Sequence, residues 1–400
     1  MTTNKKILFI SDKAVFSKEM KIAGLQVRIL EFVKALSSYK MEIIIAVEEA
    51  CDDNNYKENV TQINISDIKK LQPYDISIIQ PFYFDKYKSN LKKSLIIIDG
   101  FESPFGSFLH YSSYQYKIHG RKAINTYEKE VSIYLRALKN ADYILCANER
   151  QKISYSTILA MLGKLNPINY NNPNILLVHS FFEKGIVSDE LLNEFIQKYK
   201  IKKDKPTIVW IGGLYPWFDI ETFIKSLPIV IERINDLQIL LIGLNGVEND
   251  ANKERVFINN NSIVKDIINK HKDMFIYIPW LKYNERSIPY YLSTVAVTTY
   301  RNSLENNLSM RTRVADLLTH GVPVITTEGD YLSEVINKYN AGRTVKEGDY
   351  LKLSEELINI ISDSKYREEI KSNTIKVSEN VLNFEVQLKE LVEIINKECD

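Results

Sequence analysis

Short apolar segments alternate with helical patterns along almost the whole chain, and this alternation limits the possible folds more than any other feature. A charged segment at 188–205, which reads as a helix followed by a linker, separates two series of such segments. Repeated strand–helix–strand order predicts an α/β fold with doubly wound parallel sheets. The expected strands are Lys6–Ser11, Met41–Val47, Ile76–Ile79, Leu95–Asp99, Tyr143–Ala147 and Ile175–His179, then Thr207–Gly212, Gln238–Gly243, Met274–Pro279, Val295–Tyr300, Val322–Thr327 and Gly342–Val345.

The two series predict two Rossmann-like domains. We expect the first at 1–187 and the second at 205–379, with a C-terminal helix at about 380–400 returning to the first domain. Parallel sheets of this type bind ligands at the carboxyl ends of their strands. The sequence therefore predicts a ligand-binding cleft between two facing domains.

Composition excludes several classes of function. The net charge is +1 over 400 residues, and no basic recognition element is present, so nucleic acid is not an expected partner. Cys51, Cys146 and Cys399 are far apart, and we expect neither a metal site nor a disulfide framework. The chain shows no secretory leader and no spanning apolar run, which predicts a cytoplasmic protein. A small basic excess in the first 190 residues is compatible with peripheral docking at the inner face of an anionic membrane, or simply with a solvated surface.

The segment Leu308–Asp330 carries the strongest local signal for a binding site. It reads as a helix capped by Ser309 and ended by Gly321, followed by a buried strand. Arg311 and Arg313 crowd the start of this helix, where the helix dipole ordinarily favours negative charge. Their position predicts a helix start that receives an anion.

Two carboxylates accompany these arginines. Glu305 lies shortly before the helix, and Asp316 shares a stripe of the helix with Ser309. The functional interpretation is that this group, together with Arg311 and Arg313, holds a nucleotide-diphosphate sugar. The alternative is a surface ion network without a ligand.

The loop I-G-G-L-Y-P-W-F-D follows the first strand of the second series. Gly212 and Gly213 at a strand end, before a helix capped by Asp219, suit a phosphate or pyrophosphate, although glycine pairs also form plain turns. Tyr215 and Trp217 are candidates for walling a sugar or a base, and packing is the alternative.

The first domain offers three candidates. Gly24 follows a long loop after the first strand, and it either permits close backbone approach to a ligand or simply starts a helix. Asp99 ends the strand L-I-I-I-D, and Glu102 follows in G-F-E-S-P. Either carboxylate could bind hydroxyls or act as a base, and the alternative is a helix cap.

Taken together, these residues resemble a known family. The helix R-V-A-D-L-L-T-H-G-V-P-V-I-T-T is similar to the C-terminal element of the retaining GT-B glycosyltransferases of family 4, also called group 1. The chain further resembles a bacterial subgroup that acts in surface-polysaccharide synthesis. The matching segments are A-G-L-Q-V-R, D-Y-I-L-C-A-N-E-R-Q, G-K-L-N-P, W-I-G-G-L-Y-P-W-F-D, S-M-R-T-R-V-A-D and E-G-D.

The resemblance implies a hexosyltransferase-type activity. A sugar would pass from a nucleotide-diphosphate donor to a hydroxyl of a glycan, lipid-linked or protein acceptor, with retention of configuration and without metal or cofactor. By resemblance, Asp316 contacts the donor ribose, and Trp280 and Leu281 lie where the nucleobase is held. The residues expected to act in catalysis are Asp99, Glu102, Glu305 and Arg311.

The sequence also departs from the family. The family pattern has an arginine after the first glycine of the glycine loop and a lysine soon after it, and both grip the diphosphate. Gly213 and Phe218–Asp219 occupy those positions here. Our hypothesis is that Arg311 and Arg313 take over this work. Two alternatives are a nucleotide-sugar epimerase of the same fold and a catalytically inactive nucleotide-sugar binding subunit.

Overall fold

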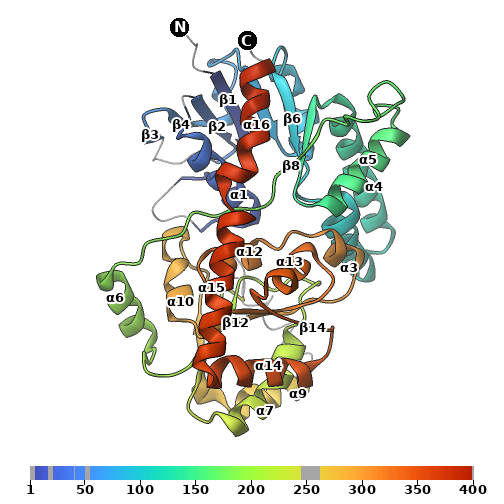
Figure 1. The fold of residues 1–400 in the computed structure, drawn as a ribbon. Helices are drawn as coiled ribbons and strands as arrows, with labels where there is room; N and C mark the ends of the chain where they lie inside the picture. The colour runs from blue at the N-terminus through green and yellow to red at the C-terminus, as the bar shows by residue number, and fades with distance from the viewer. Residues whose placement is uncertain (1–4, 17–20, 40, 50–54, 245–261, 399–400) are drawn as a thin grey trace. The chain divides into compact units, whose positions relative to one another are not determined.

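The computed structural model describes residues 5–16, 21–39, 41–49, 55–244 and 262–398 (Figure 1). Cys51 and Cys399, which the sequence analysis considered, lie outside these ranges. The chain divides into two compact units. Unit 1 comprises Met1–Ser180, Leu308–Met310 and Phe384–Asp400, and unit 2 comprises Phe181–Asn307 and Arg311–Asn383.

Unit 1 is built on an eight-stranded sheet in the order β3-β4-β2-β1-β5-β6-β7-β8. Neighbouring strands are parallel except for the antiparallel pair β3 and β4 at one edge. The strands are β1 (Lys5–Ser11), β2 (Met41–Val47), β3 (Asn55–Lys57), β4 (Val60–Asn64), β5 (Ile76–Ile79), β6 (Leu95–Asp99), β7 (Tyr143–Cys146) and β8 (Ile175–Leu177). The helices are α1 (Gly24–Leu36), α2 (Pro81–Tyr87), α3 (Leu109–His119), α4 (Arg121–Asn140), α5 (Glu149–Met161) and α16 (Phe384–Glu398), with the short turns η1 (Ile65–Asp67), η2 (Lys88–Asn90) and η3 (Pro104–Phe108).

The core of unit 1 lies between this sheet and its helices. Leu8, Ile79 and Ile98 from three central strands pack with Tyr134 of α4 and Tyr155 of α5. Strands buried on both faces read as continuous apolar runs, which is why the sequence located them. The two unpredicted strands, β3 and β4, are short and lie at the sheet edge, where burial is incomplete.

Unit 2 contains a six-stranded, fully parallel sheet in the order β11-β10-β9-β12-β13-β14. The strand order reverses between β9 and β12, which makes this position the switch point of the sheet. The strands are β9 (Thr207–Ile211), β10 (Gln238–Ile242), β11 (Phe275–Ile278), β12 (Val295–Thr298), β13 (Val324–Thr327) and β14 (Gly342–Val345). The helices are α6 (Asp189–Tyr199), α7 (Ile220–Arg233), α9 (Ser262–Lys270), α10 (Ser287–Leu292), α11 (Leu304–Leu308), α12 (Thr312–Thr319), α13 (Tyr331–Tyr339), α14 (Tyr350–Ser362) and α15 (Ser364–Asn380), with the turns η4 (Lys272–Met274) and η5 (Tyr283–Glu285).

The predicted fold class is confirmed, because each unit is an α/β unit built on a parallel sheet. All twelve expected strands are present, with ends that differ by at most two residues. The left-handed Gly321 ends α12 as expected, with φ +77°. The predicted cap by Ser309 is wrong. Leu304–Leu308 forms a separate short helix, and Arg311 occupies the N-cap position of α12 in an extended conformation.

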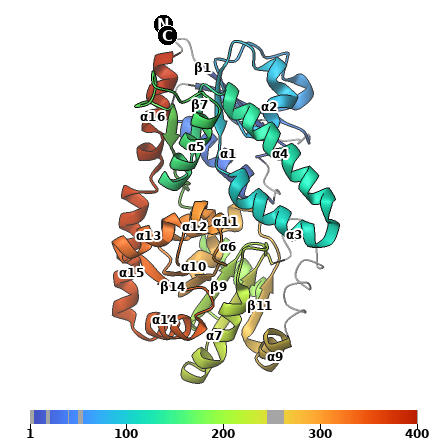
Figure 2. The same ribbon diagram turned by 90° about the vertical axis from the view of Figure 1, so that its right-hand side faces the viewer.

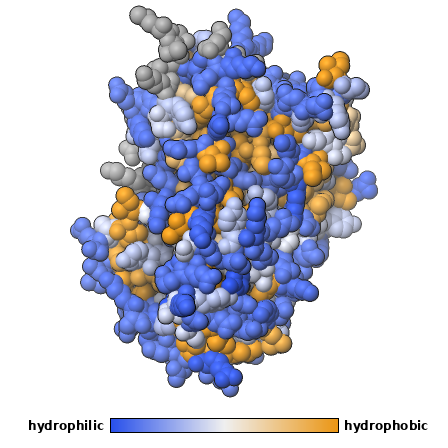
Figure 3. Space-filling view, viewed as in Figure 1, coloured by the Kyte–Doolittle hydropathy of each residue, from blue (hydrophilic) through white to orange (hydrophobic). Residues whose placement is uncertain are grey.

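Within the described residues, no helix combines the length and apolar character needed to cross a bilayer. The face shown in Figure 3 is mostly hydrophilic, with small scattered apolar patches.

Candidate functional site

The loops that follow β9 and β12 meet at the switch point of the unit 2 sheet. The Asp219 N–H donates to the Thr299 carbonyl at 2.9 Å, and the Arg301 N–H donates to the Trp217 carbonyl at 2.8 Å. Phe218 and Tyr300 form an antiparallel bridge between the same loops. The glycine loop and the segment leading to α11 are thereby joined into one backbone framework at the position where such sheets bind ligands.

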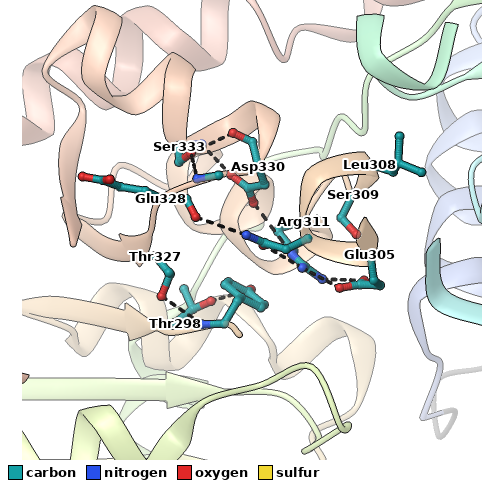
Figure 4. A network of polar contacts seen from close by, with 12 residues as sticks. Thr298, Glu305, Leu308, Ser309, Arg311, Thr327, Glu328, Asp330 and Ser333 are labelled. Carbon is teal, nitrogen blue, oxygen red and sulfur yellow. Dashed lines mark hydrogen bonds and ion pairs between the residues drawn. The ribbon is translucent and has the colours of Figure 1, made fainter. Parts of the chain in front are cut away.

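Arg311 lies in a buried network of polar side chains that also contains Glu305 and Asp330 (Figure 4). Its two terminal nitrogens donate to the two carboxylate oxygens of Glu305, both at 2.8 Å, and one also donates to Asn306 Oδ1 at 2.9 Å. Asp330 lies on the other side, with 3.7 Å between its Oδ2 and Arg311 Nε. Burial opposes the charge of Arg311, but the Glu305 carboxylate outweighs it, so the pKa of the guanidinium is raised. Arg311 is therefore held as a partner of Glu305.

Arg313 is placed differently, although it is only two residues away. Its guanidinium lies against the glycine loop, where Nη2 donates to the Gly213 carbonyl at 3.1 Å. A Cβ atom on Gly212, which has φ +99°, would lie 2.5 Å from Arg313 Nη2. Arg313 Nη1 is buried and has no hydrogen-bond partner among the described residues, and no carboxylate of that part of the chain pairs with it. Burial lowers the pKa of this guanidinium.

Aromatic rings support both arginines. Arg311 Cζ lies 4.0 Å from the ring centroid of Tyr300, and Arg313 Cζ lies 3.9 Å from that of Phe218. The two rings contact each other with centroids 5.1 Å apart. Cation–π contacts stabilise a guanidinium without neutralising it, so Arg313 keeps its capacity to attract an anion.

Tyr215 and Trp217, from the same loop, stack with ring centroids 4.9 Å apart and planes 3° apart. Tyr215 is exposed and Trp217 is half-buried. The sequence left open whether these rings pack or wall a ligand, and the structure has them packing on each other while Tyr215 keeps an accessible surface.

Asp316 lies on α12 and is buried, with polar groups around its carboxylate. Its Oδ2 accepts from Tyr290 Oη at 2.9 Å and from Arg286 Nε at 3.2 Å, and Oδ1 lies 3.2 Å from His320 Nδ1. Burial alone would raise the pKa of Asp316, but Arg286 and the bonds from His320 and Tyr290 lower it. Asp316 is thus a carboxylate of fixed orientation.

His320 also approaches Ser287, with 3.0 Å between Nε2 and the hydroxyl oxygen. This Ser–His–Asp order does not form a nucleophilic site. Ser287 is buried, the Gly185 N–H donates to the same Nε2 at 3.0 Å, and a Cβ on Gly185 would lie 2.0 Å from the Ser287 oxygen. The Gly185 backbone thus occupies the space beside the Ser287 hydroxyl, and on the other side of the ring His320 Nδ1 is hydrogen-bonded to the Asp316 backbone carbonyl at 2.8 Å.

Trp280 and Leu281 follow β11. Trp280 packs against the end of β10, since a Cβ on Gly243, which has φ +72°, would lie 3.1 Å from Trp280 Cε3. Leu281 is buried in the core formed with α6 and β10. These residues therefore lie at the carboxyl edge of the same sheet as Arg313.

In unit 1, Asp99 is buried at the end of β6 and paired with Arg28. Arg28 Nε and Nη2 both donate to the Asp99 carboxylate, at 2.8 to 3.1 Å. The guanidinium lies between the rings of Phe32 and Phe101, 4.8 and 4.7 Å from their centroids. Asp99 is thus held in an ion pair, and sequence reasoning did not anticipate Arg28.

The loop after Asp99 is fixed through three successive carbonyls. Gly100 O accepts from Tyr155, Phe101 O accepts from Gln151 at 3.0 Å, and Glu102 O accepts from Tyr134 at 2.8 Å. These contacts fix the backbone that carries the partly exposed Glu102 side chain.

The remaining candidates are less defined. Gly24 is the first residue of α1, and a Cβ there would meet no described atom within 4 Å. Ser309 lies in the three-residue segment that groups with unit 1. The described residues contain no group of three or more His, Cys, Asp or Glu side chains arranged to hold a metal ion.

Sequence reasoning missed the residues that fix the candidates: Arg28, Tyr134, Gln151, Tyr155, Arg286, Tyr290, Tyr300 and Asp330. Asp330 had a signal, because its E-G-D motif was among the family-like segments. Arg28 and Gln151 had the same kind of signal, because they end the family-like segments A-G-L-Q-V-R and D-Y-I-L-C-A-N-E-R-Q. The others come from distant parts of the chain, and no local pattern marks them.

Comparison with known proteins agrees with the resemblance. Residues 205–363 match the family described as "Glycosyl transferases group 1". The capsular polysaccharide biosynthesis glycosyltransferase CapM of Staphylococcus aureus is 24% identical over 239 residues, which cover 60% of this chain. The match spans only 57% of CapM's own length.

Solved structures match along nearly the full length. HepE of Anabaena, in complex with UDP-glucose, has a TM-score of 0.68 at 11% identity, covering 98% of this chain and 99% of HepE. WaaG, a glycosyltransferase involved in lipopolysaccharide biosynthesis, has a TM-score of 0.65 at 12% identity, with 98% and 100% covered. Sucrose-phosphate synthase of Thermosynechococcus elongatus has a TM-score of 0.67 at 12% identity, with 99% of both chains covered. The fold of this chain is thus the GT-B fold, and the group 1 family is supported for residues 205–363.

Proposed function

We propose that this chain is a group 1 glycosyltransferase that transfers a hexosyl residue from a nucleotide-diphosphate donor to an acceptor hydroxyl with retention of configuration. The observation that carries the proposal is Arg313, a cation with a buried, unpartnered N–H group against the glycine loop at the switch point. The family match of residues 205–363 supports it independently. The likeness to CapM supports a role in surface-polysaccharide or glycoconjugate synthesis.

Arg313 provides what the chemistry needs. During transfer, the bond between the anomeric carbon and the diphosphate oxygen breaks, and negative charge develops on the departing diphosphate. A new bond forms between the anomeric carbon and the acceptor oxygen, whose proton passes to the departing phosphate. A preorganised guanidinium aimed at that phosphate stabilises the transition state more than the ground state. In this proposal Arg313, rather than a metal ion, supplies the positive charge.

Other groups of unit 2 hold the rest of the donor. We assign Asp316 to the ribose hydroxyls, because its fixed carboxylate has lone pairs beyond those its partners use. Glu305 is assigned to the donor sugar, with Arg311 as the residue that positions it. We assign Trp280 and Leu281 to the nucleobase. Gly212, Gly213, Tyr215 and Trp217 complete the proposed donor contacts of unit 2. Gly24 and Ser309 are proposed donor contacts from unit 1.

In unit 1, Glu102 is the stronger candidate for orienting the acceptor hydroxyl. The Asp99 carboxylate is engaged by Arg28, whereas the backbone of Glu102 is fixed and its side chain is partly exposed. The acceptor class we propose is a glycan, a lipid-linked sugar or a protein.

The proposal is tested by a thermal-shift panel of UDP, dTDP, GDP and ADP with their common sugars, followed by turnover of the responding donor. A ligand at 100 times its Kd stabilises the protein by about 2.7 kcal/mol. We expect nucleotides of one base to raise the unfolding temperature of the protein. The sugar nucleotide of that base should be slowly hydrolysed, with release of the sugar in its original anomeric form. Interconversion of sugar nucleotides would indicate the epimerase alternative, and tight binding without turnover would indicate the inactive binding subunit. No response to any nucleotide would overturn the proposal.

A further inference from the structure

Helix α3 of unit 1 has an unusual surface for a helix of a globular protein. None of its eleven residues, Leu109–His119, is buried. Most helices in proteins are stabilised by packing an apolar face against a core. Several large apolar side chains of α3 are instead exposed, with Tyr116 at 52% and Ile118 at 59%. These side chains do not serve the core of unit 1.

The exposed apolar residues continue around the corner between α3 and α4. Gly120, with φ +54°, joins the two helices, and Figure 2 shows α3 and α4 meeting at this corner. We define the α3–α4 corner surface as the exposed side chains of Leu109, Tyr111, Tyr116, Lys117, Ile118, Arg121, Lys122 and Ile124.

The charged side chains of the α3–α4 corner surface are all positive. No Asp or Glu occurs between Glu102 and Glu128, although the chain contains 51 acidic residues in 400 and a stretch of this length would ordinarily hold about three. Lys117, Arg121 and Lys122 are all exposed. The surface therefore combines aromatic and aliphatic side chains with cations, and the segment 103–127 that forms it contains no carboxylate side chain.

We propose that the α3–α4 corner surface docks on an anionic lipid bilayer. Tyrosine suits the bilayer interface because its ring is apolar and its hydroxyl stays hydrated. Lysine and arginine are attracted to anionic headgroups while their stems cover apolar surface. A protein partner fits less well, since protein interfaces are depleted in lysine. The docking goes beyond the proposed activity, and its test requires no nucleotide.

The test is co-sedimentation of the full chain with vesicles of equal parts phosphatidylglycerol and phosphatidylcholine, compared with phosphatidylcholine alone. The native protein binds the anionic vesicles, and added salt weakens the binding. The triple variant Lys117→Gln/Arg121→Gln/Lys122→Gln lowers the partition coefficient at least about tenfold, because each cation near the surface contributes about fivefold. The double variant Tyr116→Ser/Ile118→Ser also lowers it.

The matched control is Lys69→Gln/Lys92→Gln/Lys139→Gln, which removes three exposed lysines of the same unit. It retains most of the binding. Equal loss in the control and the corner variant would overturn the proposal, as would native binding that is equally strong to neutral vesicles. Self-association in sedimentation velocity that disappears in the double variant, without vesicle binding, would assign the surface to a second copy of the chain instead. Unchanged unfolding temperatures show that the variants fold.

Discussion

Arg311 and Arg313 flank the same pair of aromatic rings but have opposite surroundings. Arg311 is buried between Glu305 and Asp330, and the Glu305 carboxylate raises its pKa despite burial. Arg313 contacts a ring and a backbone carbonyl but no carboxylate among the described residues, and burial lowers its pKa. Each arginine has one buried nitrogen without a hydrogen-bond partner, Nε in Arg311 and Nη1 in Arg313, but only the Arg311 nitrogen faces a carboxylate. One arginine completes an internal network, and the other lacks an anion.

The two side chains are chemically identical, so their different surroundings indicate different roles. A buried ion pair with both partners present fixes geometry, and removing one partner is costly. A buried donor without a partner costs stability and is retained where a ligand satisfies it. We therefore propose that Arg311 positions Glu305, whereas Arg313 binds the donor diphosphate. The following predictions test this separation.

The largest effect is expected on stability at Arg311. Arg311→Ala leaves the Glu305 carboxylate buried without its partner and should lower the free energy of unfolding by about 3–5 kcal/mol. Urea unfolding measures this change. Arg313→Ala should lower it by less than about 1 kcal/mol, since it also removes an unsatisfied donor. Equal destabilisation by the two variants would mean that both arginines are structural.

Turnover should show the reverse order. Arg313→Ala is expected to lower kcat for the donor by about 100-fold or more, the usual loss when one preorganised donor to a developing charge is removed. The control is Arg301→Ala, which removes an exposed arginine of the neighbouring loop and should leave kcat unchanged. A loss below about tenfold in Arg313→Ala contradicts the assignment.

An arginine at position 213 should also be able to replace Arg313. In the family pattern an arginine stands at the position of Gly213, which, unlike Gly212, does not have a positive φ. Adding Gly213→Arg to Arg313→Ala is expected to restore at least about tenfold of the lost kcat, about 1.4 kcal/mol of barrier. The single variant Gly213→Arg, with both arginines competing for the space beside the loop, is the comparison. Absence of any recovery would indicate that Arg313 acts through local packing.

The smallest effect concerns Asp316, the buried carboxylate of α12. The pKa of Asp316 lies below the ordinary range of an aspartate in the folded chain, because Arg286, His320 and Tyr290 together outweigh burial, so the unfolded chain binds protons more readily. Its contribution to stability is complete above the unfolded pKa and is lost as the pH falls towards the folded one. Native protein should therefore lose more stability than Asp316→Asn between about pH 6 and about pH 3. Parallel curves would show that Asp316 is not held by Arg286 and His320.

The sequence allowed the fold to be predicted more fully than the site. The strands were visible because residues such as Ile208, Val297 and Ile325 are buried on both faces of a parallel sheet and form continuous apolar runs. The polar edge strands β3 and β4 lack that signal. Ser309 has a residue type that favours the N-cap position, but α12 begins only at Thr312, and the side chain of Arg311 at the N-cap position is bonded to Glu305 of the preceding helix.

The two arginines could not be distinguished from the sequence, where they stand two residues apart in the same motif. Their roles depend on partners that folding brings together. Glu305 and Asp330 reach Arg311 from separate elements, and Phe218 reaches Arg313 from a loop almost a hundred residues earlier. Sequence patterns report periodicity and local spacing, and neither specifies such contacts.

The most direct test of the central claim is to compare the Kd of the responding nucleoside diphosphate with that of its nucleoside, in native protein and in Arg313→Ala. We predict that Arg313→Ala weakens binding of the diphosphate by at least about tenfold, or 1.4 kcal/mol, and leaves binding of the nucleoside unchanged. Equal diphosphate affinity in the two proteins would contradict the claim that Arg313 holds the donor diphosphate.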